Sequence, residues 1–240
     1  MKAIKTLVHL KEVGLNANLL KILAVTAMLV DHGFRLFTEE GTQERWWVHL
    51  FGRLAMPIIC YLVAESHHYT TNKKRYMWRI FLFAIISHIP YVAYFNLSYF
   101  RATSVMWTIL LGVIGLEIVK NEKVHTIYKI LGIALCCLLA VPANWHYVGV
   151  LWIVSFGIFR DNFSKKVIAF AIIGILLYIY PGLQDLGMQA TYRFGQLLVI
   201  PILYLYNGQP GKRNKFSRWA FYWFYPMHLV LLLGIRYFFF

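Results

Sequence analysis

Asp31, His32 and Arg35 lie in the second half of an otherwise apolar run that begins near Leu19. Residues three and four positions apart are neighbours on a helix, so these three side chains share one arc of its surface. A carboxylate beside an imidazole is a general-base arrangement, because the carboxylate fixes the tautomer of the ring and stabilises its charged form. We therefore predict that His32, assisted by Asp31, accepts a proton.

Other apolar runs carry polar residues at a similar depth. If each run crosses a membrane as a helix, Asp31 lies roughly 18 Å from one surface and Arg53 roughly 10 Å from the other. A charge at that depth costs at least about 2.5–3.5 kcal/mol, so it must face protein or water. This convergence predicts one polar site within the membrane. Its further members are His88, Arg193, Gln196 and His228.

A general base beside buried arginines, which can stabilise an oxyanion, favours acyl transfer. The predicted catalytic residues are Asp31, His32, Arg53 and His228. The predicted substrate-binding residues include Arg35, His88, Arg193 and Gln196. No metal is expected, because Cys136 and Cys137 have no histidine nearby and zinc-binding spacings are absent. In the alternative interpretation, a lone histidine packs in a helix and Asp31 and Arg35 neutralise each other.

The composition indicates the elements that hold these residues. Of 240 residues, 60% are hydrophobic and 14% are charged, whereas soluble domains are nearer half apolar and a quarter charged. The apolar blocks match a hydrocarbon core of about 30 Å. We predict an all-α, polytopic membrane bundle, one transmembrane domain over residues 1–240. About nine helices are expected, at 19–38, 46–65, 76–95, 103–119, 126–141, 146–159, 166–181, 188–206 and 219–238.

The net charge of +14 lies mainly in alternate loops, as membrane topology requires, so nucleic acid is not an expected partner. The basic residues of these loops are Lys2, Lys5, Lys11, Lys73, Lys74, Arg75, Lys120, Lys123, Arg160, Lys165, Lys166, Lys212, Arg213, Lys215 and Arg218. The opposite loops, at 38–45, 141–144 and 181–185, carry few. By the positive-inside rule, the N-terminus is cytoplasmic and the C-terminus external.

The loop Tyr-Asn-Gly-Gln-Pro-Gly-Lys-Arg at 206–213 combines exposed backbone N–H groups with basic side chains. Such a loop can hold phosphates, although it also fits a plain turn whose lysines set the topology. The cofactor-binding residues that we predict are Lys73, Lys74, Arg79, Asn207, Gly208, Gly211, Lys212 and Arg213.

Several segments together resemble the TraX family of bacterial membrane proteins over nearly the whole chain. They are Leu-Lys-Ile-Leu-Ala-Val-Thr-Ala-Met-Leu-Val-Asp-His at 20–32, Gly-Arg-Leu-Ala-Met-Pro-Ile at 52–58, Ser-His-Ile-Pro-Tyr at 87–91, Leu-Tyr-Asn-Gly-Gln-Pro-Gly at 205–211 and Phe-Tyr-Trp-Phe-Tyr-Pro-Met-His-Leu at 221–229. TraX is the F-pilin acetylase of conjugative plasmids, grouped with multispan membrane acyltransferases. The resemblance implies N-acetylation of a protein amine by acetyl-CoA in the bacterial cytoplasmic membrane.

Matched to the family's motifs, the functional positions fall on Asp31, His32, Arg53, Asn207, Gly208, Gly211, Tyr225 and His228. The resemblance adds Tyr225 to the predicted substrate-binding residues. The chain departs from the family pattern at His88, where glutamine is expected, and in the His-Tyr-Val-Gly segment that ends at Gly149.

Acetyl-CoA is anionic, so its phosphates are expected at the basic cytoplasmic face while its pantetheine arm carries the thioester inward. The expected partners are acetyl-CoA, a pilin-like protein amine presented from outside, and membrane lipid. Two alternatives remain open at this point. A proton-coupled transporter also places such groups at mid-membrane. A non-catalytic assembly partner for pili would use the charges for helix packing.

Overall fold

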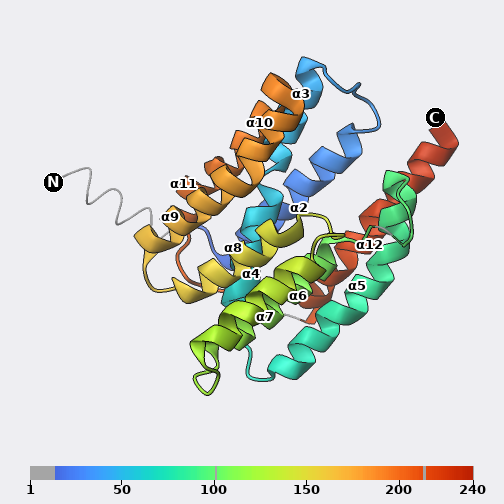
Figure 1. Cartoon of the computed structure of the whole chain (residues 1–240). Helices are drawn as coiled ribbons and strands as arrows, with labels where there is room; N and C mark the ends of the chain where they lie inside the picture. The colour runs from blue at the N-terminus through green and yellow to red at the C-terminus, as the bar shows by residue number, and fades with distance from the viewer. Residues whose placement is uncertain (1–13, 101, 213–214, 240) are drawn as a thin grey trace.

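A computed structural model describes residues 14–100, 102–212 and 215–239 (Figure 1). This part of the chain is helical and contains no strand, which confirms the all-α fold. The helices are α2 (Ala17–Phe34), α3 (Gln43–Gly52), α4 (Ala55–Tyr69), α5 (Lys73–Phe95), α6 (Val105–Lys120), α7 (Thr126–Leu139), α8 (His146–Ile158), α9 (Phe163–Gly174), the π-helix η1 (Ile175–Ile179), α10 (Tyr180–Leu186), the 3₁₀-helix η2 (Gly187–Leu198), α11 (Val199–Tyr204) and α12 (Lys215–Phe239).

Four helical stretches of the described chain are long and apolar enough to cross a membrane: Ala17–Phe34, Gln43–Tyr69, Lys73–Phe95 and Phe163–Tyr204. Helices α7 and α8 are apolar but shorter. The chain is therefore a helical membrane protein. The number of nine spans, the single domain and the orientation of the termini remain predictions.

Two predicted boundaries differ from the structure. The second predicted span, 46–65, is divided into α3 and α4, with Arg53 and Leu54 between them. The predicted loop at 181–185 is helical, because α10 continues directly from the π-helix η1 with Pro181 in its first turn. The chain turns instead at Gly187, whose φ of +59° is positive, as glycine adopts readily.

Helix α4 forms the centre of the bundle (Figure 1). Twelve of its fifteen residues are buried, as expected of a helix that is apolar on all sides. Helices α6 and α8 approach closely through glycine. A Cβ added at Gly112 would collide with Ile153, and one at Gly157 would collide with Leu116. Small residues at a helix crossing give close van der Waals packing, which is a main source of helix association in a membrane.

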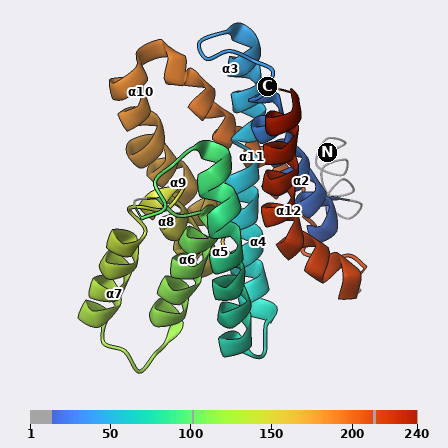
Figure 2. The same ribbon diagram turned by 90° about the vertical axis from the view of Figure 1, so that its right-hand side faces the viewer.

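The helices do not all extend to both ends of the bundle. In Figure 2, α3 and α10 rise to the upper edge of the view, whereas α6 and α7 occupy its lower half. The α4–α5 and α6–α7 connections lie at the lower end. Near its start, α6 is joined to the segment before α8 by a short bridge between Thr103 and Ala143. The start of α6 and the start of α8 thus lie inside the bundle, where they reach the cavity described next.

Candidate functional site

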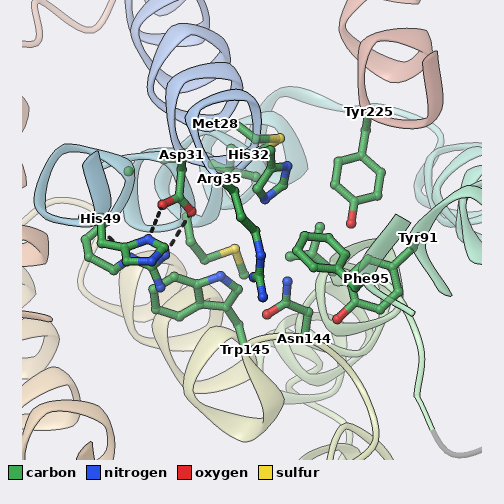
Figure 3. Close-up of a pocket in the computed structure, with 16 residues that line it drawn as sticks. Met28, Asp31, His32, Arg35, His49, Tyr91, Phe95, Asn144, Trp145 and Tyr225 are labelled. Carbon is green, nitrogen blue, oxygen red and sulfur yellow. Dashed lines mark hydrogen bonds and ion pairs between the residues drawn. The ribbon is translucent and has the colours of Figure 1, made fainter. Parts of the chain in front are cut away.

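A cavity of about 240 Å³ lies where α2, α3, α4, α5, α6, α8 and α12 meet (Figure 3). Five residues predicted from the sequence line it: Asp31, His32, Arg35, Arg53 and Tyr225. Sites for drug-sized ligands are usually about 300–1,000 Å³. This cavity therefore has room for the reacting ends of two molecules and not for a whole large cofactor.

Asp31 is held by two partners from the neighbouring segment. Its Oδ1 lies 2.6 Å from Nδ1 of His49, and its Oδ2 accepts a hydrogen bond from Nη2 of Arg53 at 2.8 Å. Gly52 makes this approach possible, because a Cβ at that position would collide with the Asp31 side chain. The Gly-Arg pair in the sequence thus supplies both the space for the carboxylate and its counter-charge.

The guanidinium of Arg53 is largely occupied. Besides Asp31, it donates from Nη1 to the hydroxyl of Tyr178 at 2.8 Å and from Nε to the carbonyl of His49 at 3.3 Å. It also lies over the ring of Trp145, 5.4 Å from the centroid. Tyr178 belongs to the π-helix η1, a distortion that is frequent at functional sites.

His32 pairs with His228 of α12, which lies next to the cavity. Nδ1 of His32 is 2.9 Å from Nε2 of His228, and the two rings are stacked. Nδ1 of His228 is 2.9 Å from the carbonyl oxygen of Phe224. A carbonyl only accepts hydrogen bonds, so Nδ1 of His228 carries a hydrogen. In the neutral pair, Nε2 of His228 then accepts from Nδ1 of His32, which leaves Nε2 of His32 unprotonated.

The predicted Asp31–His32 pair is wrong. Consecutive residues on an α-helix point about 100° apart. Asp31 turns toward α3 and His32 turns toward α12, as Figure 3 shows for Asp31 and His49. The carboxylate beside an imidazole does exist, but the imidazole is that of His49, which the sequence analysis did not select. His49 could have been found from its position one helical turn before Arg53.

Arg35 extends into the cavity (Figure 3). It follows His32 by three residues and therefore lies on the same face of the helix. Its closest carboxylate is that of Glu40, at 3.6 Å, and the Arg35 side chain is 42% exposed. The guanidinium also lies over the ring of Phe95, 5.2 Å from its centroid. Compared with Arg53, Arg35 is therefore a lightly engaged cation that can meet a ligand.

Three predicted residues lie away from the cavity wall. His88 bonds through Nε2 to the carbonyl of Tyr99 at 3.0 Å. Arg193 stands behind the site, where Nη1 donates to the carbonyl of Tyr178 at 2.7 Å. Gln196 is fully buried against Gly174, and within the described chain its amide has no hydrogen-bond partner. Arg193 and Gln196 thus support the segment that holds Arg53.

The loop that we expected to hold phosphates is bound to the start of α2. The backbone N–H of Ala17 donates to Gln209, that of Asn207 donates to Leu15, and the Asn207 side chain donates to Gly14. Gly208 and Gly211 adopt φ angles of +76° and +73°, which favour glycine. The glycines and Asn207 are thereby explained by the turn itself. Lys212 is exposed beside it, and Arg213 lies outside the described residues.

The other predicted cofactor residues lie in α5. Arg79 packs over the rings of Tyr76 and Tyr222, while Lys74 is exposed in the first turn. Lys73 lines a second cavity with residues of α4 and α6. In the described chain no three His, Cys, Asp or Glu residues are grouped as metal ligands would be, and the expectation of no metal stays a prediction.

Comparison with known proteins adds two similarities. A family model described as "TraX protein" matches residues 16–236. The chain is also 26% identical over 244 residues to a "Probable fimbrial assembly protein FimC, serogroup H1" of Dichelobacter nodosus, and the match covers 95% of this chain and 98% of that protein. No solved structure matches the chain.

Proposed function

Since the chain belongs to the TraX family, we propose that it is an acyltransferase of the bacterial cytoplasmic membrane. It would transfer an acetyl group from acetyl-CoA to an amine at the cavity between α2 and α12. The observation that carries this proposal is the His32–His228 pair beside a lightly engaged arginine. Acyl transfer to an amine needs a group that accepts a proton and a cation that stabilises an oxyanion, and this cavity has both.

In the proposed reaction, the neutral amine attacks the thioester carbonyl and forms a C–N bond. Nε2 of His32 takes the proton that the nitrogen loses, and the positive charge spreads to His228 through their hydrogen bond. The negative charge on the tetrahedral oxygen lies toward the guanidinium of Arg35. The C–S bond then breaks, and the proton held by His32 passes to the leaving thiolate, which restores the neutral pair.

Arg53, which we expected to stabilise the oxyanion, is better suited to hold Asp31 in place. Its guanidinium already donates to three acceptors of the protein. Its proposed role is therefore to fix the junction of α3 and α4 against α2. Asp31 and His49 complete that polar cluster beside the reacting groups.

The acceptor that we propose is the free amino end of a pilin-like protein. Two observations support it. The cavity of about 240 Å³ fits an end group better than the middle of a folded chain. The similar protein from Dichelobacter nodosus is named as a probable fimbrial assembly protein. That name also favours a second candidate function, a pilus assembly partner without catalytic activity.

The test is acetyl transfer by the purified protein in detergent, with acetyl-CoA, a peptide that has a free N-terminus, and detection of the released thiol. His32→Ala is expected to lower the rate by about 100-fold or more, because general-base catalysis typically contributes 10²- to 10⁴-fold. His228→Ala is expected to have a smaller effect in the same direction. His125→Asn, at the exposed start of α7, serves as the matched control.

Full activity of His32→Ala would overturn the mechanism while leaving the activity in place. If wild type neither binds acetyl-CoA nor releases thiol, the enzyme proposal fails. Loss of pili in cells that lack the protein would then support the assembly function instead.

A further inference from the structure

A second cavity, of about 480 Å³, lies at the other end of the helices that form the first one. Helix α4 contributes Met56 to the first cavity and His67 to the second. Helix α5 contributes Tyr91 to the first cavity and Lys73 to the second. Helix α6 runs from Val105 in the first cavity to Lys120 in the second. The fifteen residue steps between them correspond to roughly 22 Å of helix. The same three helices therefore connect the two cavities.

Three ammonium groups from different segments line this second cavity. Lys73 begins α5, Lys120 ends α6, and Lys123 lies in the connection to α7. Glu117 and Glu122 are the two carboxylates of the lining.

His67 shows how this charge is arranged. Its side chain is 2% exposed, and its Nε2 lies 2.6 Å from Oε2 of Glu117. A carboxylate accepts hydrogen bonds, so Nε2 of His67 carries the hydrogen, and Glu117 is already engaged. The buried Nδ1 of His67 has no hydrogen-bond partner within the described chain. The hydrogen bond does not cancel the charge of Glu117, but the three lysines still outnumber the two carboxylates of the lining.

We infer that the cavity lined by His67, Lys73, Lys120 and Lys123 binds a phosphate-bearing ligand with two or more negative charges. Ammonium groups hold phosphate oxygens through charge-assisted hydrogen bonds, and an anion between them relieves the repulsion of like charges. Two sources share this chemistry: the phosphates of the acyl donor, or the headgroup of an anionic phospholipid.

The donor assignment rests on the proposed function. Acetyl-CoA carries its phosphates at one end and its thioester at the other, with the pantetheine arm between them. The two cavities lie toward opposite ends of α4, α5 and α6, so one could hold the phosphates while the other receives the thioester. The 206–211 loop is bound to the start of α2 instead, so the second cavity replaces that loop as the phosphate site.

The test is the binding of adenosine 3′,5′-bisphosphate and of inorganic pyrophosphate, measured by calorimetry on the full chain in neutral detergent. We expect Lys120→Gln with Lys123→Gln to weaken the binding of both by about tenfold. Both lysines are exposed, so folding is preserved. Lys129→Gln with Lys165→Gln removes the same charge outside the cavity, from one partly exposed and one exposed position, and is expected to change nothing.

Glu117→Gln provides a test of opposite sign. Glutamine still accepts the hydrogen bond of His67 but removes a negative charge from the lining, so tighter binding of both anions is expected. The lipid source is tested by retention of phosphatidylglycerol against phosphatidylcholine in nanodiscs. If the cavity variants lose phosphatidylglycerol but bind the soluble anions as wild type does, the ligand is a headgroup.

Equal behaviour of the cavity and control variants toward every probe would overturn the site. That result is separable from failure of the proposed function. If wild type transfers acetyl groups but the cavity variants bind every probe as wild type does, the proposed phosphate site is wrong and the proposed enzymatic activity stands. If the protein retains phosphatidylglycerol selectively but wild type transfers no acetyl group, the proposed enzymatic activity is wrong and the phosphate site stands.

Discussion

At the scale of single residues, the site consists of two separate polar groups on two different faces of α2. Asp31 belongs to one, with His49 and Arg53, and His32 belongs to the other, with His228. The side chains of Asp31 and Arg53 are 12% and 16% exposed, so their charges compensate each other where little water reaches them. We therefore propose that the first group holds α2 against α3 and that the second accepts the proton.

Asp31→Asn is expected to destabilise the folded protein by on the order of 3 kcal/mol, because it leaves the buried charge of Arg53 uncompensated. The measurement is thermal unfolding in detergent. The double variant Asp31→Asn, Arg53→Gln is expected to lose less free energy of unfolding than the sum of the losses in the two single variants.

Glu40→Gln is the control, since the Glu40 side chain is 77% exposed and its ion pairs are loose. Additive effects of Asp31→Asn and Arg53→Gln would show that the two charges do not stabilise each other.

At the scale of elements, the connection between α11 and α12 fixes the start of α2 and so the direction from which His32 and Arg35 enter the cavity. Asn16 caps α2 by accepting from the backbone of Asn18 and Leu19. The side chain of Asn18 donates to the carbonyl of Lys212 at 2.8 Å. A sequence motif that resembles a phosphate loop therefore holds the start of α2 against the segment that precedes α12.

Gly211→Ala is expected to destabilise the protein more than Gly208→Ala. Both positions have positive φ, which costs alanine about 1–2 kcal/mol. A Cβ at Gly211 would also lie 2.8 Å from Nδ2 of Asn18, whereas one at Gly208 would have no atom within 4 Å. Thermal unfolding of the two variants measures the difference.

Binding of acetyl-CoA to the folded fraction of each variant should match wild type. If Gly208→Ala and Gly211→Ala unfold at the same temperature and both bind acetyl-CoA more weakly than wild type, the loop is a phosphate site after all.

At the scale of the whole molecule, basic residues mark one end of the bundle. Lys73, Lys120 and Lys123 surround the second cavity there, and the α2–α3 connection with Glu39 and Glu40 lies at the other end. The positive-inside rule assigns the basic end to the cytoplasm. An acyl donor made in the cytoplasm and an acceptor outside could then meet at the first cavity from opposite sides.

This orientation predicts the accessibility of introduced cysteines in intact cells. Glu40→Cys is expected to react with a membrane-impermeant maleimide, whereas Lys123→Cys is expected to react only after the cells are permeabilised. Cys60 and Cys136 are buried and Cys137 is partly exposed, so the protein without an introduced cysteine serves as the control for background labelling. The reverse pattern of labelling would invert the orientation and place the lysine cavity outside.

The sequence alone determined the all-helical membrane fold, because an apolar block of sufficient length must satisfy its backbone hydrogen bonds internally. It also identified four ionisable residues of the cavity lining, since a charge within an apolar run must face protein or water. Asp31, His32, Arg35 and Arg53 were selected on that ground, whereas Tyr225 was selected through the family resemblance.

Only the tertiary structure decided which of these residues are partners. The direction of a side chain within a helix is known from the sequence, but the helix it faces is not. Asp31 therefore contacts His49 and not the predicted His32. Likewise, the 206–211 loop is hydrogen-bonded to the start of α2, where a ligand was expected. The second cavity depends on Lys73, Lys120 and His67 converging from three helices, a proximity set by packing between segments distant in the chain.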